Sequence, residues 1–334
     1  MRKLLFSSEL VSSIYPDMLC VLDSTKQFLE ELSEVQINKD SVRKLAETVS
    51  EDDLNISEIS LAKHSWNKEQ LIGLTFVFNT INFCFWAKKD DLKWIIKDDN
   101  LDGAIALFRC LENELQRNPD FLNPDELSDL SLGALRDILK GNVTIPLLSE
   151  RLKQINIFGR VVEKKYDNSI LNIFKASNCD AYKLAEILVD DFSCFDDRSN
   201  LNGREVGFYK RAQLNSKMIH DVLLFFGEEG LTNLDKLTAF ADYKIPQILR
   251  KLEILKYSER LTNKIDNFEL IDVGSKEENE IRVATIWGVE YLKQELKRKF
   301  NFVTSSHVDS MLWNKSQTKS SGDKPYHRTL TTAY

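Results

Sequence analysis

The segment FADYKIPQIL, residues 240–249, contains a carboxylate whose position fits two kinds of role. Asp242 precedes an apolar stretch with Pro246 in its first turn, and an Asp at such a point caps the free N–H groups of a helix. The same point suits an ionised carboxylate that acts on a ligand, because the helix dipole is positive there. Phe240 would then be the flat wall of a pocket. The two roles are compatible, and the segment leaves both open.

A pair of cations marks a second candidate site, in the segment GREVGFYKRAQ. Lys210 and Arg211 stand at an expected helix start, directly after Phe208 and Tyr209. Two cations beside the free N–H groups of a helix start suit a phosphate group. A basic turn in contact with solvent has the same composition, so both interpretations stay open.

The segment HVDSMLWNK offers a second carboxylate. If it is helical, Asp309 and Trp313 lie four residues apart on one face and present an acid beside a large aromatic surface. Aromatic residues on such a face are more often core than ligand platform, but a buried carboxylate needs a partner. His64, in LAKHSW, has no partner nearby in the sequence and is typical of a structural histidine.

The composition argues against several classes of function. The net charge of −7 disfavours a nucleic-acid-binding protein, which needs a basic face, so we expect a small-molecule substrate. Five cysteines form no CxxC pair and four histidines show no HxxxH or HExxH spacing, so we expect no metal and no cofactor. The odd number of cysteines favours reduced, buried thiols in a cytoplasmic protein.

No apolar stretch is long enough for a membrane span. The longest, LTFVFNTINFCFW, is short for a bilayer and contains two asparagines, so no membrane partner is expected. The first residues, MRKLLFSSELVSS, include Glu9 within their apolar stretch, and we interpret them as the start of the folded chain.

Helical patterns dominate the chain and predict a mainly α protein with minor β structure. Asn123 and Pro124 predict one helix start, and Ser131 with Gly141 predicts the limits of the next. The segment NEIRVATIWGVEYLKQELKRKF is the clearest helix, and KIDNFELIDV is a candidate strand or short hairpin. Further helices are expected near residues 17–34, 67–83, 101–116, 146–164, 180–190, 208–226, 244–255 and 305–314.

The polar stretch DDRSNLNG is the best candidate for a boundary inside the chain. It would divide an N-terminal helical subdomain, residues 1–200, from a C-terminal helical subdomain, residues 201–334, within one compact catalytic unit. The polar segment 315–324 is expected to form a surface loop or lid, and the segment PYHRTLTTAY to pack back onto the body.

Taken together, these segments resemble the queuosine salvage protein family, from about residue 35 onward. Each motif is weak alone, and their order and spacing carry the resemblance. The motifs are FNTINFCFW (78–86), FYKRAQ (208–213), FADYKIPQIL (240–249), NEIRVATIWGVE (279–290), DSMLW (309–313) and PYHR (325–328).

The resemblance implies a helical fold related to the helical DNA glycosylases and an N-glycosylase activity on queuosine 5′-phosphate. The product would be queuine, the free base, for reinsertion into tRNA. Competing interpretations are a DNA or other nucleoside N-glycosylase of the helical class, and a helical scaffold without activity. No Gly-rich helix-hairpin-helix loop is present, which counts against a DNA glycosylase. We expect the protein to act as a monomer.

The resemblance also implies roles for individual residues. Asp242 falls on the catalytic carboxylate beside the ribose C1′, and Phe240 on an aromatic residue that holds the base. Asp309 falls on a carboxylate that contacts the base, and His64 lies near a base-contacting histidine. Trp313 and Asn314 stand where another aromatic residue and another acid are expected, so Asn314 removes a charge there.

Overall fold

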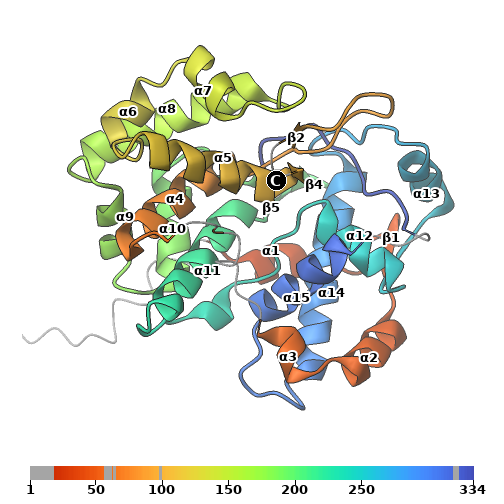
Figure 1. The fold of residues 1–334 in the computed structure, drawn as a ribbon. Helices are drawn as coiled ribbons and strands as arrows, with labels where there is room; N and C mark the ends of the chain where they lie inside the picture. The colour runs from red at the N-terminus through yellow and green to blue at the C-terminus, as the bar shows by residue number, and fades with distance from the viewer. Residues whose placement is uncertain (1–18, 56–61, 63–64, 98–99, 319–322) are drawn as a thin grey trace, which may run out of the picture.

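Helices make up most of the chain, and the strands form only three short antiparallel pairs (Figure 1). The structure is a computed structural model and describes residues 19–55, 62, 65–97, 100–318 and 323–334. Its helices are α1 (Val21–Lys26), α2 (Lys39–Thr48), α3 (Glu51–Leu54), α4 (Lys68–Ile81), α5 (Gly103–Arg117), α6 (Pro124–Ser128), α7 (Leu132–Ile138), α8 (Leu148–Lys165), α9 (Ile170–Ala176), α10 (Ala181–Asp191), α11 (Lys210–Phe225), α12 (Lys244–Lys251), α13 (Glu259–Asp266), α14 (Lys276–Leu296) and α15 (Ser305–Gln317), with a 3₁₀ turn η2 (Leu234–Lys236). The predicted mainly α fold with minor β structure is confirmed.

The strands pair segments that are close in the chain, with one exception. β2 (Ile95–Ile96) pairs with β3 (Leu101–Asp102), and β4 (Arg198–Leu201) with β5 (Arg204–Gly207). The exception is β1 (Val35–Ile37), which pairs with the distant β6 (Leu255–Tyr257) in the register Val35 to Tyr257. This pair joins the early part of the chain to its last third.

Most predicted helices start where their capping residues indicate. Ser131 accepts a hydrogen bond from the N–H of Ala134 at the start of α7, and Pro124 occupies the first turn of α6. The Ser275 side chain accepts a hydrogen bond from the N–H of Glu278 at the start of α14. α14 is the longest helix of the described chain. The clearest helical pattern in the sequence is thus confirmed.

Two predicted elements differ from the structure. The helix expected near residues 17–34 ends at Lys26. After it the chain forms turns in which an N–H donates to the carbonyl oxygen three residues earlier, as from Phe28 to Thr25. The candidate strand or short hairpin KIDNFELIDV is wrong, apart from an isolated bridge between Leu270 and Arg328. Its first three residues end α13, because Leu261 and Ile265, four residues apart, share a buried helical face, and Phe268 then turns the chain at a φ of 64°.

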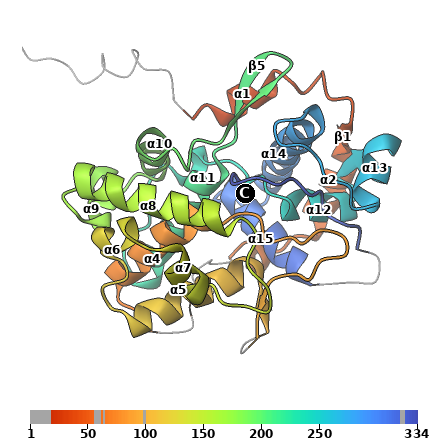
Figure 2. The same ribbon diagram turned by 90° about the horizontal axis from the view of Figure 1, so that it is seen from above.

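Helices α4 to α9 gather on one side of the molecule, and α12, α13 and α14 with α2 gather on the other (Figures 1 and 2). Between them lie α11, which packs on α4 and α10, and α15, which packs on α12 and α14. The early helices α2 and α3 pack on α14 and α15, and the β4–β5 hairpin occupies the predicted boundary near residue 200. The spatial grouping therefore does not follow a single division of the chain at that point.

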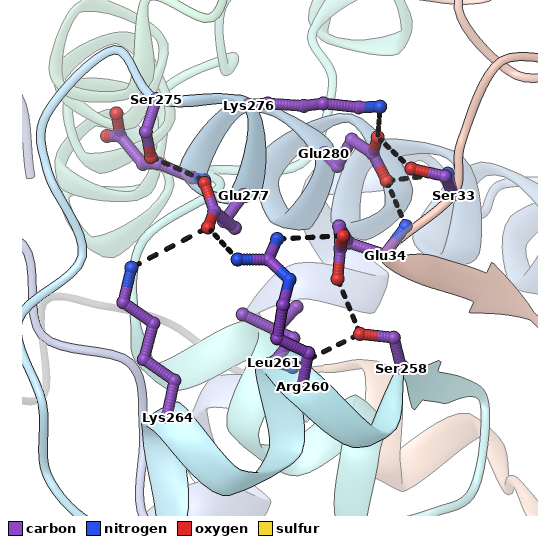
Figure 3. Close-up of polar contacts among 11 residues, drawn as sticks. Ser33, Glu34, Ser258, Arg260, Leu261, Lys264, Ser275, Lys276, Glu277 and Glu280 are labelled. Atoms are coloured by element: carbon purple, nitrogen blue, oxygen red, sulfur yellow. Dashed lines mark hydrogen bonds and ion pairs between the residues drawn. The ribbon is translucent and has the colours of Figure 1, made fainter.

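A network of polar contacts holds the chain before β1 against the start of α14 (Figure 3). The Glu280 carboxylate is buried and accepts the N–H groups of Ser33 and Glu34 at 2.8 and 2.6 Å. The Arg260 guanidinium lies between the carboxylates of Glu34 and Glu277, at 2.8 Å from each. Because Arg260 is largely exposed, the Glu280 contacts should contribute more to stability than this ion pair.

The described helices include none that is long and apolar enough to cross a membrane. All five cysteines are free. The expectation that they are buried is confirmed for Cys84 and Cys110, whereas Cys20 and Cys194 are half-buried. It is wrong for Cys179, which is exposed in the turn after α9. The expectation that the segment 325–334 packs on the body is confirmed, since His327 and Tyr334 are both buried. The predicted loop 315–324 begins inside α15, and residues 319–322 lie outside the described chain.

Candidate active site

A cavity of about 130 Å³ lies where α5, α11, α12 and α15 meet the end of α4 and residues 326–334. Its walls combine aromatic rings with charged groups of both signs. The aromatic residues are Phe78, Phe85, Phe240, Tyr243, Trp313, Tyr326 and Tyr334, and the charged residues are Lys93, Asp102, Lys210, Asp242, Lys244 and Asp309. A planar, partly charged ligand suits such a lining.

Asp242 both caps a helix and lines the cavity. Lys244 and Ile245 are the first two residues of α12. Their N–H groups donate hydrogen bonds to Asp242 Oδ1, at 2.7 and 2.9 Å. Its Oδ2 has no hydrogen-bond partner among the described residues, and the side chain is nearly buried, at 9% exposed. The two roles that the sequence left open are therefore compatible in the structure, one for each oxygen.

The segment that leads to Asp242 is fixed by side chains from two helices, α11 and α15. Gln213 of α11 accepts the N–H of Thr238 at 2.7 Å. Two residues later in the chain, the N–H of Phe240 donates to Asp309 of α15 at 2.8 Å. Because each bond holds the main chain rather than a side-chain tip, the position of Asp242 is set before α12 begins.

Three of the predicted base-binding residues line this cavity. Phe240 is buried, Asp309 is 3% exposed and Trp313 is half-buried. Asp309 and Trp313 lie one turn apart on α15 and face the same space, as their spacing predicts. The sequence therefore identified residues that the fold brings together, although their roles remain predictions.

The two other predicted base-binding residues have different outcomes. Asn314 is exposed on α15 and does not line the cavity, because it lies a helical step away from the face that Trp313 shares. His64 lies outside the described residues.

Only one of the two predicted phosphate-binding cations lines the cavity. Lys210, the first residue of α11, lines the cavity, and its N–H donates to Asp197 Oδ2 at 3.2 Å. Arg211 is 2% exposed and does not line the cavity. Its guanidinium donates to the carbonyl oxygens of Asn79 and Thr80 at the end of α4, at 2.9 and 2.6 Å. Arg211 is thus committed to joining α11 to α4, and its contacts leave Lys210 as the candidate for a phosphate.

The start of α11 depends on a close approach of main chain to side chain. Tyr209, the residue before the helix, has a φ of 48°, and its ring lies against Gly207. A Cβ at position 207 would lie 2.4 Å from that ring, so any larger residue there would force the Tyr209 ring to move. This contact fixes where Lys210 enters the cavity.

Lys244 is a cavity residue that the sequence did not single out. Its ammonium donates to the Ser316 carbonyl oxygen and the Gln247 side-chain oxygen, at 3.3 Å each, and lies 5.9 Å from the centre of the Tyr326 ring. Burial lowers the pKa of Lys244, and the Asp242 carboxylate opposes that effect. The residue stands inside the segment FADYKIPQIL, but nothing in the sequence shows which way its side chain turns.

The outer part of the cavity carries an exposed ion pair. Lys93 and Asp102 are 2.7 Å apart, and their side chains are 39% and 40% exposed. Asp102 precedes α5, whose first residues from Gly103 to Ile105 also line the cavity. No motif indicated this pair, because it depends on how the short β2–β3 hairpin folds.

The cavity therefore places a carboxylate with one open oxygen between aromatic walls, with a lysine on α11 nearby. Within the described part of the chain, no cluster of three or more metal-ligating side chains is found. Such an arrangement can stabilise a developing positive charge on a ligand whose flat portion lies against aromatic rings.

The sequence pattern that defines the family described as queuosine salvage protein matches residues 62–334. A protein of Sphaerobacter thermophilus is 33% identical over 324 residues, which cover 95% of this chain and 98% of that protein. A mouse protein is 31% identical over 279 residues, covering 80% and 82%, and one from Bos taurus is 29% identical over 339 residues, covering 95% and 99%. All three carry the name queuosine 5′-phosphate N-glycosylase/hydrolase.

Proposed function

The chain belongs to the queuosine salvage protein family, and on that premise we propose that it hydrolyses the N-glycosidic bond of queuosine 5′-phosphate and releases queuine. The relatives that carry this activity in their names match it along nearly their whole length. The observation that carries the proposal is Asp242, whose Oδ1 is held by the start of α12 while its Oδ2 has no partner among the described residues that surround the cavity.

The substrate explains why a carboxylate is needed at that place. Cleavage of a glycosidic bond develops positive charge on the ribose, and a nearby carboxylate stabilises that charge or attacks C1′. An ordinary purine leaves more easily once N7 is protonated, but a 7-deaza base has carbon there. More of the barrier must therefore be lowered from the sugar side, where Asp242 acts from a nearly buried position.

The remaining groups of the cavity fit the rest of the nucleotide. Phe240 and Trp313 offer surfaces for the planar base, and Asp309 is the carboxylate that contacts it. The queuine side chain carries an amine that is cationic near neutral pH, which suits a cavity with several carboxylates. Lys210 is the cation for the 5′-phosphate.

We also propose that the protein acts on the free nucleotide, as a monomer in the cytoplasm and without a metal or cofactor. The net charge of −7 supports a free nucleotide over a polynucleotide. The five free cysteines support a reducing compartment.

The test is incubation with queuosine 5′-phosphate, followed by mass spectrometry for free queuine. Guanosine 5′-phosphate is the control substrate, because it shares the phosphate and ribose but has an ordinary purine. We expect queuine release that is unchanged by EDTA. Absence of queuine from a folded preparation would contradict the proposed function, and activity that EDTA removes and zinc or magnesium restores would contradict the absence of a metal.

A further inference from the structure

Arg282, in the first half of α14, contacts Asp197 and the main chain just before Asp242, and it does not line the cavity. The side chain is 2% exposed. Its Nε donates to the carbonyl oxygen of Ala241 at 3.2 Å, and its two terminal nitrogens donate to both oxygens of Asp197, at 2.8 and 2.6 Å. Its guanidinium carbon lies 3.9 Å from the centre of the Phe208 ring and 4.6 Å from that of Tyr334.

One of these contacts leads directly to the candidate catalytic carboxylate. Ala241 immediately precedes Asp242, and its carbonyl is part of the peptide group that joins the two residues. Since Asp309 already holds the N–H of Phe240, the contact from Arg282 completes a set of main-chain bonds along the segment. Loss of that bond would allow the peptide before Asp242 to rotate.

The other contact leads to the candidate phosphate cation. Asp197 Oδ2, which accepts from Arg282, also accepts the N–H of Lys210 at 3.2 Å. The main-chain oxygen of Asp197 accepts the N–H of Phe208 at 3.0 Å. Asp197 thus fixes the turn from which α11 and its first side chain enter the cavity.

We propose that Arg282, through its pair with Asp197, is a positioning residue that sets the separation between Asp242 and Lys210. This inference rests on the proposed function. The ribose C1′ and the 5′-phosphate of a nucleotide are a fixed part of one ligand, so a carboxylate and a cation that act on them must be held at a matching separation. Small errors in such placement cost on the order of 10²-fold in rate.

The chemistry of the pair explains why an arginine is required. Burial alone would lower the pKa of Arg282, but the Asp197 carboxylate more than offsets this and raises it, so the guanidinium stays charged. A buried pair of charges is held together only when the geometry is good and the remaining hydrogen bonds are made. The planar fork of arginine donates to Asp197 with two nitrogens and to Ala241 with the third, whereas a lysine has a single nitrogen.

The experiment uses Arg282→Lys in the full chain, with kcat and KM measured for queuosine 5′-phosphate and for the nucleoside queuosine. We expect kcat for the nucleotide to fall by about 10²-fold. The preference for nucleotide over nucleoside should shrink, because Lys210 no longer stands at the matching distance. Binding of queuine should change by less than about threefold, since a lysine keeps a positive charge near the Tyr334 ring and Asp309 still holds the main chain at Phe240.

A double variant separates positioning from general stability. In an Asp242→Asn background the carboxylate that Arg282 positions is already absent, so Arg282→Lys should lower single-turnover cleavage by less than about threefold more. Full additivity of the two losses in kcat would overturn the proposal. So would an unchanged ratio of nucleotide to nucleoside activity.

Arg250→Lys is the matched control. Arg250 makes a similar two-nitrogen pair with Asp266, at 2.7 and 3.2 Å, and its guanidinium lies 5.2 Å from the centre of the Tyr257 ring. It does not line the cavity. We expect this change to lower the melting temperature and to leave kcat, KM and the substrate preference unaltered. If Arg282→Lys behaved in the same way, Arg282 would be structural only.

Asp197→Asn provides a second route if Arg282→Lys is too unstable to purify. It keeps the shape of the side chain and should reproduce the reduced substrate preference; failure of both variants to fold would show a purely structural role. An inactive wild-type protein would instead contradict the proposed function. An active wild type with unaffected variants would contradict only the positioning role.

Discussion

At the scale of single residues, the division of work between the two oxygens of Asp242 is the central feature of the site. Oδ1 accepts two N–H groups of α12, which holds the carboxylate in place. On the proposed function, the helix cap would orient the catalytic carboxylate, so the capping pattern in the sequence bears on both roles.

Replacing Asp242 with Asn should separate these two tasks. An asparagine oxygen can still accept the N–H groups of Lys244 and Ile245, so the melting temperature should change little. The negative charge that faces the ribose is lost, and loss of one preorganised electrostatic partner costs about 10²–10³-fold in rate. Thermal melting, queuine binding and single-turnover cleavage, measured on one preparation, test this.

Asp309→Asn is the control for that change, because Asp309 also combines an N–H contact, from Phe240, with a place in the cavity wall. It should weaken queuine binding more than it slows cleavage. Cleavage by Asp242→Asn within a few-fold of wild type would reduce Asp242 to a cap and make Asp309 the next candidate.

At the scale of secondary structure, the start of α11 shows what a sequence motif leaves undetermined. Lys210 and Arg211 are neighbours, and as a pair of cations they are equivalent in the sequence. On a helix, however, neighbours point about 100° apart, and only one of them faces the cavity. The phosphate site at this helix start stays a prediction for Lys210, which lines the cavity. Arg211 instead donates to carbonyl groups that the last turn of α4 leaves without helical partners.

Separate substitutions of the two cations should therefore give different results. Lys210→Ala should raise KM for the nucleotide strongly, since a charge-assisted contact contributes on the order of 1.5–3 kcal/mol, and leave activity on the nucleoside nearly unchanged. Arg211→Ala should chiefly reduce the free energy of unfolding, by about 1–3 kcal/mol for each unsatisfied group. The buried carbonyl oxygens of Asn79 and Thr80 lose the guanidinium that donates to them. Denaturant unfolding and steady-state kinetics on both variants distinguish these outcomes, and equal losses on nucleotide and nucleoside for Lys210→Ala would refute the phosphate assignment.

The helices that the sequence predicted well have both a cap and a long apolar face. α14 and α15 have these features, and α15 brings Asp309 and Trp313 to the cavity as predicted. Residues such as Arg282 and Lys244 escaped prediction because their roles depend on contacts between distant helices. Arg282 sits within a motif of the family resemblance, yet its partners Asp197 and Ala241 lie 85 and 41 residues away in the chain.

At the scale of the whole molecule, residues 326–334 connect the cavity wall to the buried core. Tyr326 and Tyr334 line the cavity, and the hydroxyl of Tyr334 donates to Glu278 Oε1 at 2.8 Å. The Nε2 atom of His327 lies 3.2 Å from the Tyr334 hydroxyl oxygen, and the His327 side chain is 2% exposed. Its other ring nitrogen has no hydrogen-bond partner among the described residues. A proton on His327 would therefore place a charge in a buried position near the Arg282 guanidinium.

That burial predicts how the stability of the protein depends on pH. Burial lowers the pKa of His327 to about 3, and the nearby charge of Arg282 acts in the same direction. In the unfolded chain a histidine has a pKa of about 6.5. Between these values the unfolded state binds a proton that the folded state does not, so the free energy of unfolding falls as the pH is lowered from about 6.5. Glu278 opposes this trend, since burial raises the pKa of its carboxyl group.

His327→Gln should remove the histidine contribution and keep a polar group near the Tyr334 hydroxyl. We expect the wild type to lose on the order of 2 kcal/mol more than the variant between pH 7.0 and pH 4.5, because each unit of pH below the unfolded pKa contributes about 1.4 kcal/mol. The measurement is urea unfolding of both proteins at the two pH values. Comparing the two pH losses cancels the contribution of Glu278 and any constant cost of the substitution. Equal losses in the two proteins would show that His327 accepts a proton without unfolding, and that the segment can open locally instead.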